Sequence, residues 1–129
     1  MHDIETLDDI KKVVNGFYGK VRHDELLGPV FEEKIGDNWD RHLDTMHRFW
    51  QTVLLQQGQT YTGNPFSKHA ELLIGKEHFE RWLQLWKETL QENYEGPITT
   101  DAIERSHKMA QVFQVKLESL RNSGGKAIF

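Results

Sequence analysis

Cysteine is absent from the 129 residues of this chain. Without a thiol there can be no disulfide framework, no thiolate-ligated zinc or iron–sulfur site and no cysteine nucleophile. The same absence excludes thiolate ligation of a haem and its covalent attachment through a C-x-x-C-H motif. Any haem here would be held without a covalent bond, with histidine as the expected iron ligand.

Long apolar runs and a strong charge of one sign are also lacking. The net charge is -4, and acidic and basic residues are interspersed, which predicts no nucleic acid partner and no anionic membrane surface. No apolar run approaches the length needed to span a bilayer. Residues 1–6 are polar and acidic and contain no apolar signal core, so a cytoplasmic location is expected.

The motifs of two common enzyme classes are missing as well. No glycine-flanked serine supports a Ser/His/Asp hydrolase, and no glycine-rich loop is present to bind phosphate. What the chain does contain is an unusual number of aromatic residues for so polar a composition, including four Trp and seven Phe. Most of them fall on the predicted inward faces of helices.

Apolar residues recur at helical spacing along most of the chain, and no segment shows sustained strand alternation. We therefore predict an all-α fold in a single domain, 1–129, with a short flexible tail at about 122–129. The long helices are expected over residues 7–22, 38–57, 76–94 and 99–122. Asp37 and Asn38 are candidate caps for the second of these, and Thr99, Thr100 and Asp101 for the last. Residues 25–31 are expected to form a connecting segment around a Gly-Pro turn.

A histidine stands in the middle of one apolar stripe. At about 100° per residue, His42 is the centre of the stripe formed by Trp39, Met46, Phe49 and Val53. A histidine in such a position must find a hydrogen-bond partner or a cofactor. His47 falls off the stripe and is assigned to the flank or the surface.

A second histidine lies in a short, punctuated segment. Gly63, Asn64 and Pro65 mark a loop, and Pro65 is well placed as the first residue of a helix that ends at Gly75. This helix carries His69 and is too short for an ordinary structural helix. Taken alone, His69 reads more often as a partly exposed helical histidine, but the rest of the chain favours an imidazole presented to a cofactor.

The sequence also contains one alternative metal-binding motif, whose residues can be compared with the predicted inner faces of the helices. Glu104 and His107 form a Glu-x-x-His, the spacing used in di-iron carboxylate bundles, and Asp44 and His47 form a near echo. Both pairs point away from the predicted inner faces, so a di-metal site is not favoured. The constellation that remains is Tyr18, His42, His69 and Trp82 in an otherwise apolar interior, which suits a flat apolar cofactor with one axial ligand.

The sequence resembles the truncated haemoglobins, and specifically their third group, the bacterial two-over-two globins. The resemblance spans nearly the whole chain and lies in these motifs: Phe17-Tyr18, Leu27-Gly28-Pro29-Val30-Phe31, Trp39-x-x-His42, Phe49-Trp50, Gly63-Asn64-Pro65-Phe66-x-Lys68-His69 and Phe79-x-x-Trp82-Leu83. The paired-glycine motifs typical of the other two groups are missing, as the third group requires. No ligand position departs from the pattern.

This resemblance implies a truncated globin fold, a two-over-two helical sandwich around a b-type haem, iron protoporphyrin IX. Residue by residue, it makes His69 the proximal iron ligand and Tyr18, His42 and Trp82 the distal polar residues. The haem cage implied in the same way consists of Phe17, Phe31, Met46, Phe49, Trp50, Phe66 and Ile74, although several of these could be ordinary core residues. Lys68 is a candidate partner of a haem propionate, with a solvated lysine as the equally good alternative.

The implied chemistry is that of oxygen and nitric oxide, with carbon monoxide or cyanide as further iron ligands. Tyr18, Trp82 and one ring nitrogen of His42 can donate hydrogen bonds to a charged ligand in a dry pocket, which favours retention of oxygen over its delivery. We therefore expect nitric oxide detoxification or peroxidase-like activity with an external reductase. The alternatives are a non-catalytic oxygen or haem-binding sensor or carrier, and a helical domain with no cofactor.

Overall fold

The computed structural model describes residues 1–55 and 74–122, and within these ranges it contains helices and no strand. The helices are α1 (Leu7–His23), α2 (Gly28–Ile35), α3 (Trp39–Trp50), the π-helix η1 (Gln51–Leu55), α5 (Lys76–Asn93) and α6 (Pro97–Asn122). The all-α fold class is thereby confirmed. The predicted flexible tail and the short helix carrying His69 lie outside the described residues, apart from Ile74 and Gly75.

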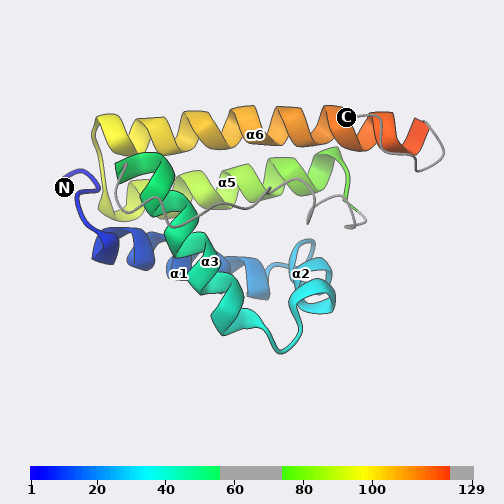
Figure 1. Ribbon diagram of the computed structural model, residues 1–129, viewed down its shortest axis with the longest axis horizontal. Helices are drawn as coiled ribbons and strands as arrows, with labels where there is room; N and C mark the ends of the chain where they lie inside the picture. Colours follow the sequence, from blue (N-terminus) through cyan, green and yellow to red (C-terminus); the bar gives the residue numbers. More distant parts are fainter. Residues whose placement is uncertain (56–73, 123–129) are drawn as a thin grey trace.

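The helices form two crossed layers. Figure 1 shows α5 and α6 running antiparallel, side by side, while α3 crosses α1 in the other layer. Contacts join α5 to α6, α1 to α5, α1 to α3 and α1 to α2. The arrangement is two helices crossed over two, and the main core fills the space between the layers.

Local signals in the sequence explain where α1 begins. The Thr6 side chain accepts a hydrogen bond from Asp9 N at 3.2 Å, and the Asp9 carboxylate accepts one from Thr6 N at 3.1 Å. This reciprocal capping box satisfies two backbone donors that would otherwise lack helical partners. The helix then buries the apolar face that the spacing predicted, so the expected range of 7–22 is confirmed to within one residue.

The short helix α2 corrects the sequence prediction, which placed only a turn and a connecting segment there. Two backbone donors at its start, Leu26 N and Leu27 N, bind the Asp24 carboxylate at 3.1 and 2.9 Å. Gly28 is required because a Cβ atom at this position would lie 2.9 Å from the Arg22 carbonyl oxygen. Eight residues are too few for helical periodicity to be recognised, and the helix depends on these contacts.

The helix expected over 38–57 is not a single α-helix. It is α-helical from Trp39 to Trp50 and continues as the π-helix η1 to Leu55, beyond which the residues are not described. Asn38 occupies the N-cap position, but no side-chain capping hydrogen bond forms, so the predicted cap is wrong. Single π-turns of this kind often occur at functional sites.

The ranges of the last two helices agree closely with the prediction, but the predicted caps of α6 do not. Helix α5 spans Lys76–Asn93, and α6 begins at Pro97, two residues earlier than expected. The cap comes from Asp3, whose carboxylate accepts hydrogen bonds from Ile98 N at 2.8 Å, Thr99 N at 2.9 Å and Thr99 Oγ1 at 2.6 Å. The predicted local caps were wrong because the N-terminal segment supplies the acceptor instead.

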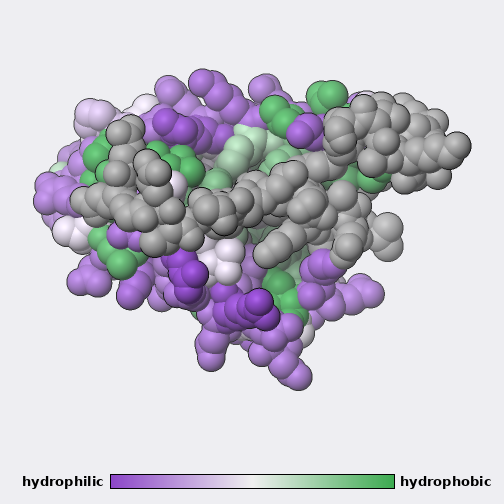
Figure 2. Space-filling view, viewed as in Figure 1, coloured by the Kyte–Doolittle hydropathy of each residue, from purple (hydrophilic) through white to green (hydrophobic). Residues whose placement is uncertain are grey.

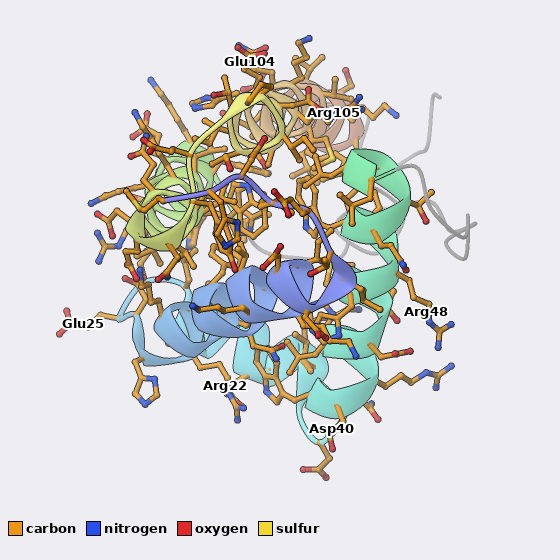
Figure 3. All side chains as sticks on the ribbon, turned by 90° about the vertical axis from the view of Figure 1, so that its left-hand side faces the viewer. Arg22, Glu25, Asp40, Arg48, Glu104 and Arg105 are labelled. Atoms are coloured by element: carbon orange, nitrogen blue, oxygen red, sulfur yellow. The ribbon has the colours of Figure 1, made fainter. Side chains whose placement is uncertain are left out.

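Charged side chains cover the outside of this arrangement. Figure 3 shows the labelled Arg22, Glu25, Asp40, Arg48, Glu104 and Arg105 pointing outward, and in Figure 2 most of the described residues on the visible face are hydrophilic. Two valines on α6, Val112 and Val115, are exposed. Among the described helices, none is both long and apolar enough to cross a bilayer.

Candidate functional site

An apolar cavity lies between the two layers. Its empty volume is about 810 Å³, including the part that opens to solvent. Every described α-helix contributes to its wall, and the lining residues are Phe17, Tyr18, Leu27, Phe31, Met46, Phe49, Trp50, Ile74, His78, Phe79, Trp82, Met109, Ala110 and Phe113.

Cofactor and ligand pockets are usually lined mostly by apolar and aromatic side chains, with a few polar groups that orient the ligand. In the described wall, oxygen and nitrogen atoms of side chains come only from Tyr18, His78 and the indoles of Trp50 and Trp82. Aromatic rings supply most of the remaining surface. The residues present therefore fit a large, flat, mostly apolar group with a few hydrogen-bonding positions, and a haem meets that description.

The structure brings together most of the residues that the sequence predicted for the site. Eight of them line the cavity: Phe17, Tyr18, Phe31, Met46, Phe49, Trp50, Ile74 and Trp82. They come from five separate parts of the chain. The predicted iron ligand His69, the cage residue Phe66 and the propionate partner Lys68 lie outside the described residues.

Tyr18 brings a hydroxyl group to the cavity from α1. Its side chain is buried, and burial raises the pKa of its phenol well above the ordinary value. The group therefore stays protonated throughout the neutral range and keeps its O–H available as a donor. Four rings meet Tyr18 edge-on: those of Phe17, Phe31, Trp39 and His42, with centroids 4.9, 6.1, 5.8 and 4.9 Å away.

Trp82 brings an indole N–H from α5, and stacked rings hold it in place. Its ring plane lies 16° from that of Trp86 with centroids 6.2 Å apart, and it meets Phe17 edge-on at 5.5 Å. Trp86 in turn stacks on Trp50, with centroids 4.8 Å apart. A donor fixed by packing on both sides loses little freedom when it binds a ligand.

His42 does not line the cavity directly. Its ring meets Tyr18 edge-on, with centroids 4.9 Å apart, and meets Trp39 edge-on at 5.8 Å. The side chain is half-buried. It thus lies beside the predicted distal donor Tyr18, one ring further from the described cavity wall.

Comparisons with known proteins identify the architecture. Residues 3–117 match the bacterial-like globin family. The chain belongs to this family. This globin is 36% identical over 111 residues to a group 3 truncated hemoglobin of Campylobacter jejuni, a match that covers 83% of this chain and 87% of the relative.

The fold of this globin also matches a solved structure. The crystal structure of a group III truncated hemoglobin from Campylobacter jejuni superposes with a TM-score of 0.82 and 34% sequence identity. The match covers 91% of this chain and 95% of that one. The truncated globin fold and the resemblance to the third group are both confirmed. Membership of the globin family implies haem and the binding of small ligands at its iron.

His78 is the clearest residue of the globin's cavity that the sequence reasoning missed. Its Nδ1 accepts a hydrogen bond from Gly75 N at 3.0 Å, so in the neutral ring the proton is on Nε2. His78 thereby closes the first turn of α5 and also offers a donor at the cavity wall. It precedes Trp82 by four residues on the same helix, and this spacing could have revealed it.

The remaining missed residues are apolar. The sequence reasoning had not assigned Phe79, Met109, Ala110 or Phe113 to the cofactor pocket. Leu27 had been placed before a turn. All five line the cavity. A helical stripe identifies an inward face, but only the packing of the layers shows which part of that face borders a cavity.

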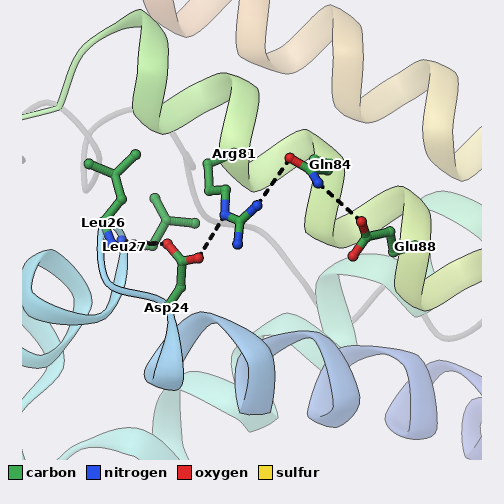
Figure 4. A network of polar contacts seen from close by, with 6 residues as sticks. All are labelled: Asp24, Leu26, Leu27, Arg81, Gln84 and Glu88. Carbon is green, nitrogen blue, oxygen red and sulfur yellow. Dashed lines mark hydrogen bonds and ion pairs between the residues drawn. The ribbon is translucent and has the colours of Figure 1, made fainter.

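An ion pair fastens the Leu27 segment to α5 beside Trp82. Arg81 Nε donates to Asp24 Oδ1 at 2.7 Å, and the chain of hydrogen bonds continues to Gln84 and Glu88 (Figure 4). Burial opposes ionisation of Asp24, but hydrogen bonds from Leu27 N, Arg81 and Leu26 N outweigh it and hold the pKa of that carboxyl below its ordinary value. The Asp24 carboxylate therefore connects Leu26 and the cavity-lining Leu27 to Arg81 of α5.

The residues of the alternative metal motif lie elsewhere in this globin. Glu104 and His107 are exposed on α6, and Asp44 pairs with Arg48 on the surface of α3. His47 Nε2 lies 2.8 Å from Asn15 Oδ1, which links α3 to α1. These residues do not converge on a common point in the described part of the chain.

Proposed function

We propose that this globin is a single domain, residues 1–129, that binds haem b in the cavity and uses it to bind oxygen and other small diatomic ligands. The observation that carries the proposal is that Tyr18 and Trp82, the two predicted distal donors, meet in one mostly apolar cavity wall. A purely structural core gains nothing from a cavity of this volume, because an unfilled interior loses packing contacts.

Haem, when bound, supplies an iron that coordinates oxygen, nitric oxide, carbon monoxide or cyanide. We assign His69 as the residue that holds this iron, because cysteine is absent and His69 is the imidazole of the Gly63–His69 motif that the group 3 resemblance implies. Phe66 is assigned to the cage with the lining residues, and Lys68 to a propionate. The cage residues exclude water and fix the plane of the group.

Tyr18 and Trp82 act on the ligand. The Tyr18 phenol stays protonated because burial raises its pKa, so its O–H donates at every pH near neutrality. The Trp82 N–H is a donor only and cannot lose its role by titration. Donors fixed in a water-poor cavity stabilise negative charge on a small ligand more strongly than the same groups in water. Such a site holds oxygen tightly.

Tight retention is better suited to redox chemistry than to oxygen delivery. The function we favour is therefore nitric oxide detoxification or a peroxidase-like activity in the cytoplasm, with electrons from an external reductase. A non-catalytic sensor or carrier would need a site from which the ligand leaves readily, or a coupled partner. A redox enzyme would convert its substrate repeatedly when a reductant is supplied, whereas a sensor or carrier would not.

The experiment has two steps. The purified protein is first examined for a Soret band and for its oxygen dissociation rate. Nitrate formation from nitric oxide is then measured with an added reductant, in the wild type and in Tyr18→Phe. We expect a haem spectrum, slow dissociation, and nitrate formation that the substitution changes. Haem binding without turnover by any added reductant would favour the sensor or carrier, and a colourless protein that takes up no haem would refute the proposal.

A further inference from the structure

Trp39 stands at the start of α3 with its ring against two of the predicted distal residues. Its centroid lies 5.8 Å from that of Tyr18 and 5.8 Å from that of His42, and both contacts are edge-on. The Tyr18 and His42 rings touch each other in the same way at 4.9 Å. Trp39 is buried, with 7% of its surface exposed. The three rings therefore form one closed cluster next to the cavity.

Two charged residues hold the outer side of this cluster. The Arg22 guanidinium lies over the Trp39 ring, 4.4 Å from its centroid, and Arg22 Nε donates to Glu32 Oε1 at 2.9 Å. Arg22 belongs to α1, Glu32 to α2 and Trp39 to α3. The hydrogen bond from Arg22 lowers the pKa of Glu32, so the carboxylate stays ionised near neutral pH. Three helices are thus joined over the face of one indole.

We propose that Trp39, held from outside by Arg22 and Glu32, is a positioning residue that sets the directions of the Tyr18 hydroxyl and the His42 imidazole. The inference rests on the proposed function, because it requires Tyr18 to face a bound ligand, with His42 packed behind it. Closely packed aromatic rings cannot turn independently, since edge-on contacts are lost when either ring rotates. A smaller side chain at position 39 would leave room for other rotamers of both neighbours.

Apart from the contact with Trp39, the Arg22–Glu32 pair is not expected to affect ligand binding directly. Arg22 and Glu32 are both about half exposed, and neither lines the cavity. Exposed ion pairs usually contribute little to stability. Removing the Arg22 guanidinium should therefore leave the fold intact while releasing the outer face of the Trp39 ring. An effect of this surface residue on a ligand inside the cavity would pass through that ring or, by way of Glu32, through the neighbouring Phe31 of α2, and the Trp39 variants separate the two routes.

The experiment compares four variants of the haem-loaded protein: Trp39→Leu, Trp39→Phe, Arg22→Met and Arg48→Met. Arg48→Met is the matched control, because it removes an exposed ion pair with Asp44 on the same helix as Trp39 without touching the ring cluster. The readouts are the C–O stretching band of the carbon monoxide complex, which reports hydrogen bonds to the ligand, and the oxygen dissociation rate. Circular dichroism confirms that each variant is folded.

We expect Trp39→Leu to broaden or split the C–O band and to speed oxygen dissociation. Trp39→Phe, which keeps an aromatic ring, should restore much of the single band. Arg22→Met should change dissociation by about threefold, the factor expected for an exposed cation–π contact, and Arg48→Met should match the wild type.

The inference is overturned if folded Trp39→Leu and Arg22→Met both keep the wild-type band and dissociation rate. Should Trp39→Leu fail to fold, Trp39→Phe and Arg22→Met decide, because Trp39→Phe keeps an aromatic ring at this position and Arg22 itself is about half exposed. A band shifted equally by Arg22→Met and Arg48→Met also counts against the inference, since it would reflect surface charge in general. A wild-type protein that takes up no haem refutes the proposed function, whereas a haem-loaded wild type with unaffected variants refutes the positioning role only.

Discussion

The imidazole of His42 meets the phenol ring of Tyr18 nearly at right angles, with centroids 4.9 Å apart and an angle of 86° between the planes. The two residues come from different helices, α3 and α1, and only Tyr18 lines the described cavity wall. A movement of the His42 ring therefore removes a packing partner of the residue that offers its hydroxyl to the ligand. The packing of the two proposed distal residues is therefore interdependent.

Tyr18→Phe and Trp82→Phe should each speed oxygen dissociation. A hydrogen bond to a charged acceptor contributes about 1.5–3 kcal/mol, so each loss should accelerate dissociation about tenfold or more. Because neighbouring donors can replace one another, the double variant should not be additive. Stopped-flow dissociation rates test this. Wild-type rates in both single variants would show that these residues are not the distal donors.

His69→Ala should lose haem or bind it weakly, because the substitution removes the proposed iron ligand. The matched control is His107→Ala, which removes an exposed histidine of α6 that does not line the cavity. Soret absorbance per protein molecule measures haem occupancy. A His69→Ala protein with the wild-type band and full occupancy would remove His69 as the ligand.

His42 should control ligand entry in a pH-dependent way. Imidazoles ordinarily titrate near pH 6.5, and a protonated ring is poorly accommodated between Tyr18 and Trp39, the two rings that it meets among the described residues. Protonation should favour an outward position of the ring, so carbon monoxide association should quicken as the pH falls. We expect His42→Leu to flatten this dependence.

Flash photolysis between about pH 5 and pH 8 provides the measurement. His47→Leu is a useful control, because His47 lies on the same helix but is joined to Asn15 and does not line the cavity. Identical pH profiles for the wild type and His42→Leu would restrict His42 to packing or to a static hydrogen bond.

Asp24→Asn should destabilise the protein in a pH-dependent way. The Asp24 carboxylate binds Leu26 N, Leu27 N and Arg81, and its pKa in the folded protein is lowered. A lowered folded pKa adds stability that is fully present above the ordinary carboxyl pKa and is lost as the pH falls through the folded value. We expect a loss of about 1–2 kcal/mol at pH 7, a modest figure because Arg81 is partly exposed.

Denaturant unfolding of the haem-free protein at neutral and acidic pH measures this difference. The gap between wild type and Asp24→Asn should narrow in acid, because the wild type then loses the same charge. Asp101→Asn, which disrupts an exposed ion pair with Arg105, should have little effect at either pH. An equal gap at both pH values would mean that the carboxylate charge is not what stabilises this segment.

The sequence alone was sufficient to predict those features that depend on neighbouring residues or on a regular spacing of apolar residues. Apolar spacing predicted α1, α5 and most of α6, because a helix that packs on one side must carry its apolar residues every three or four positions. The lack of cysteine excluded whole classes of site. Aromatic motifs such as Phe17-Tyr18 and Phe49-Trp50 pointed to a cofactor pocket, and these residues do line one cavity.

Only the tertiary structure decided features that depend on residues far apart in the chain. Helix α2 is too short to show a period and rests on Asp24, while the first turn of α6 is capped by Asp3, more than ninety residues earlier. His78 lines the cavity wall together with residues of the other helices, whereas His42 packs against the ring of Tyr18 and does not line it. A stripe fixes which side of a helix faces inward, but the crossing of helices determines which inward residue meets the cavity and which meets another side chain.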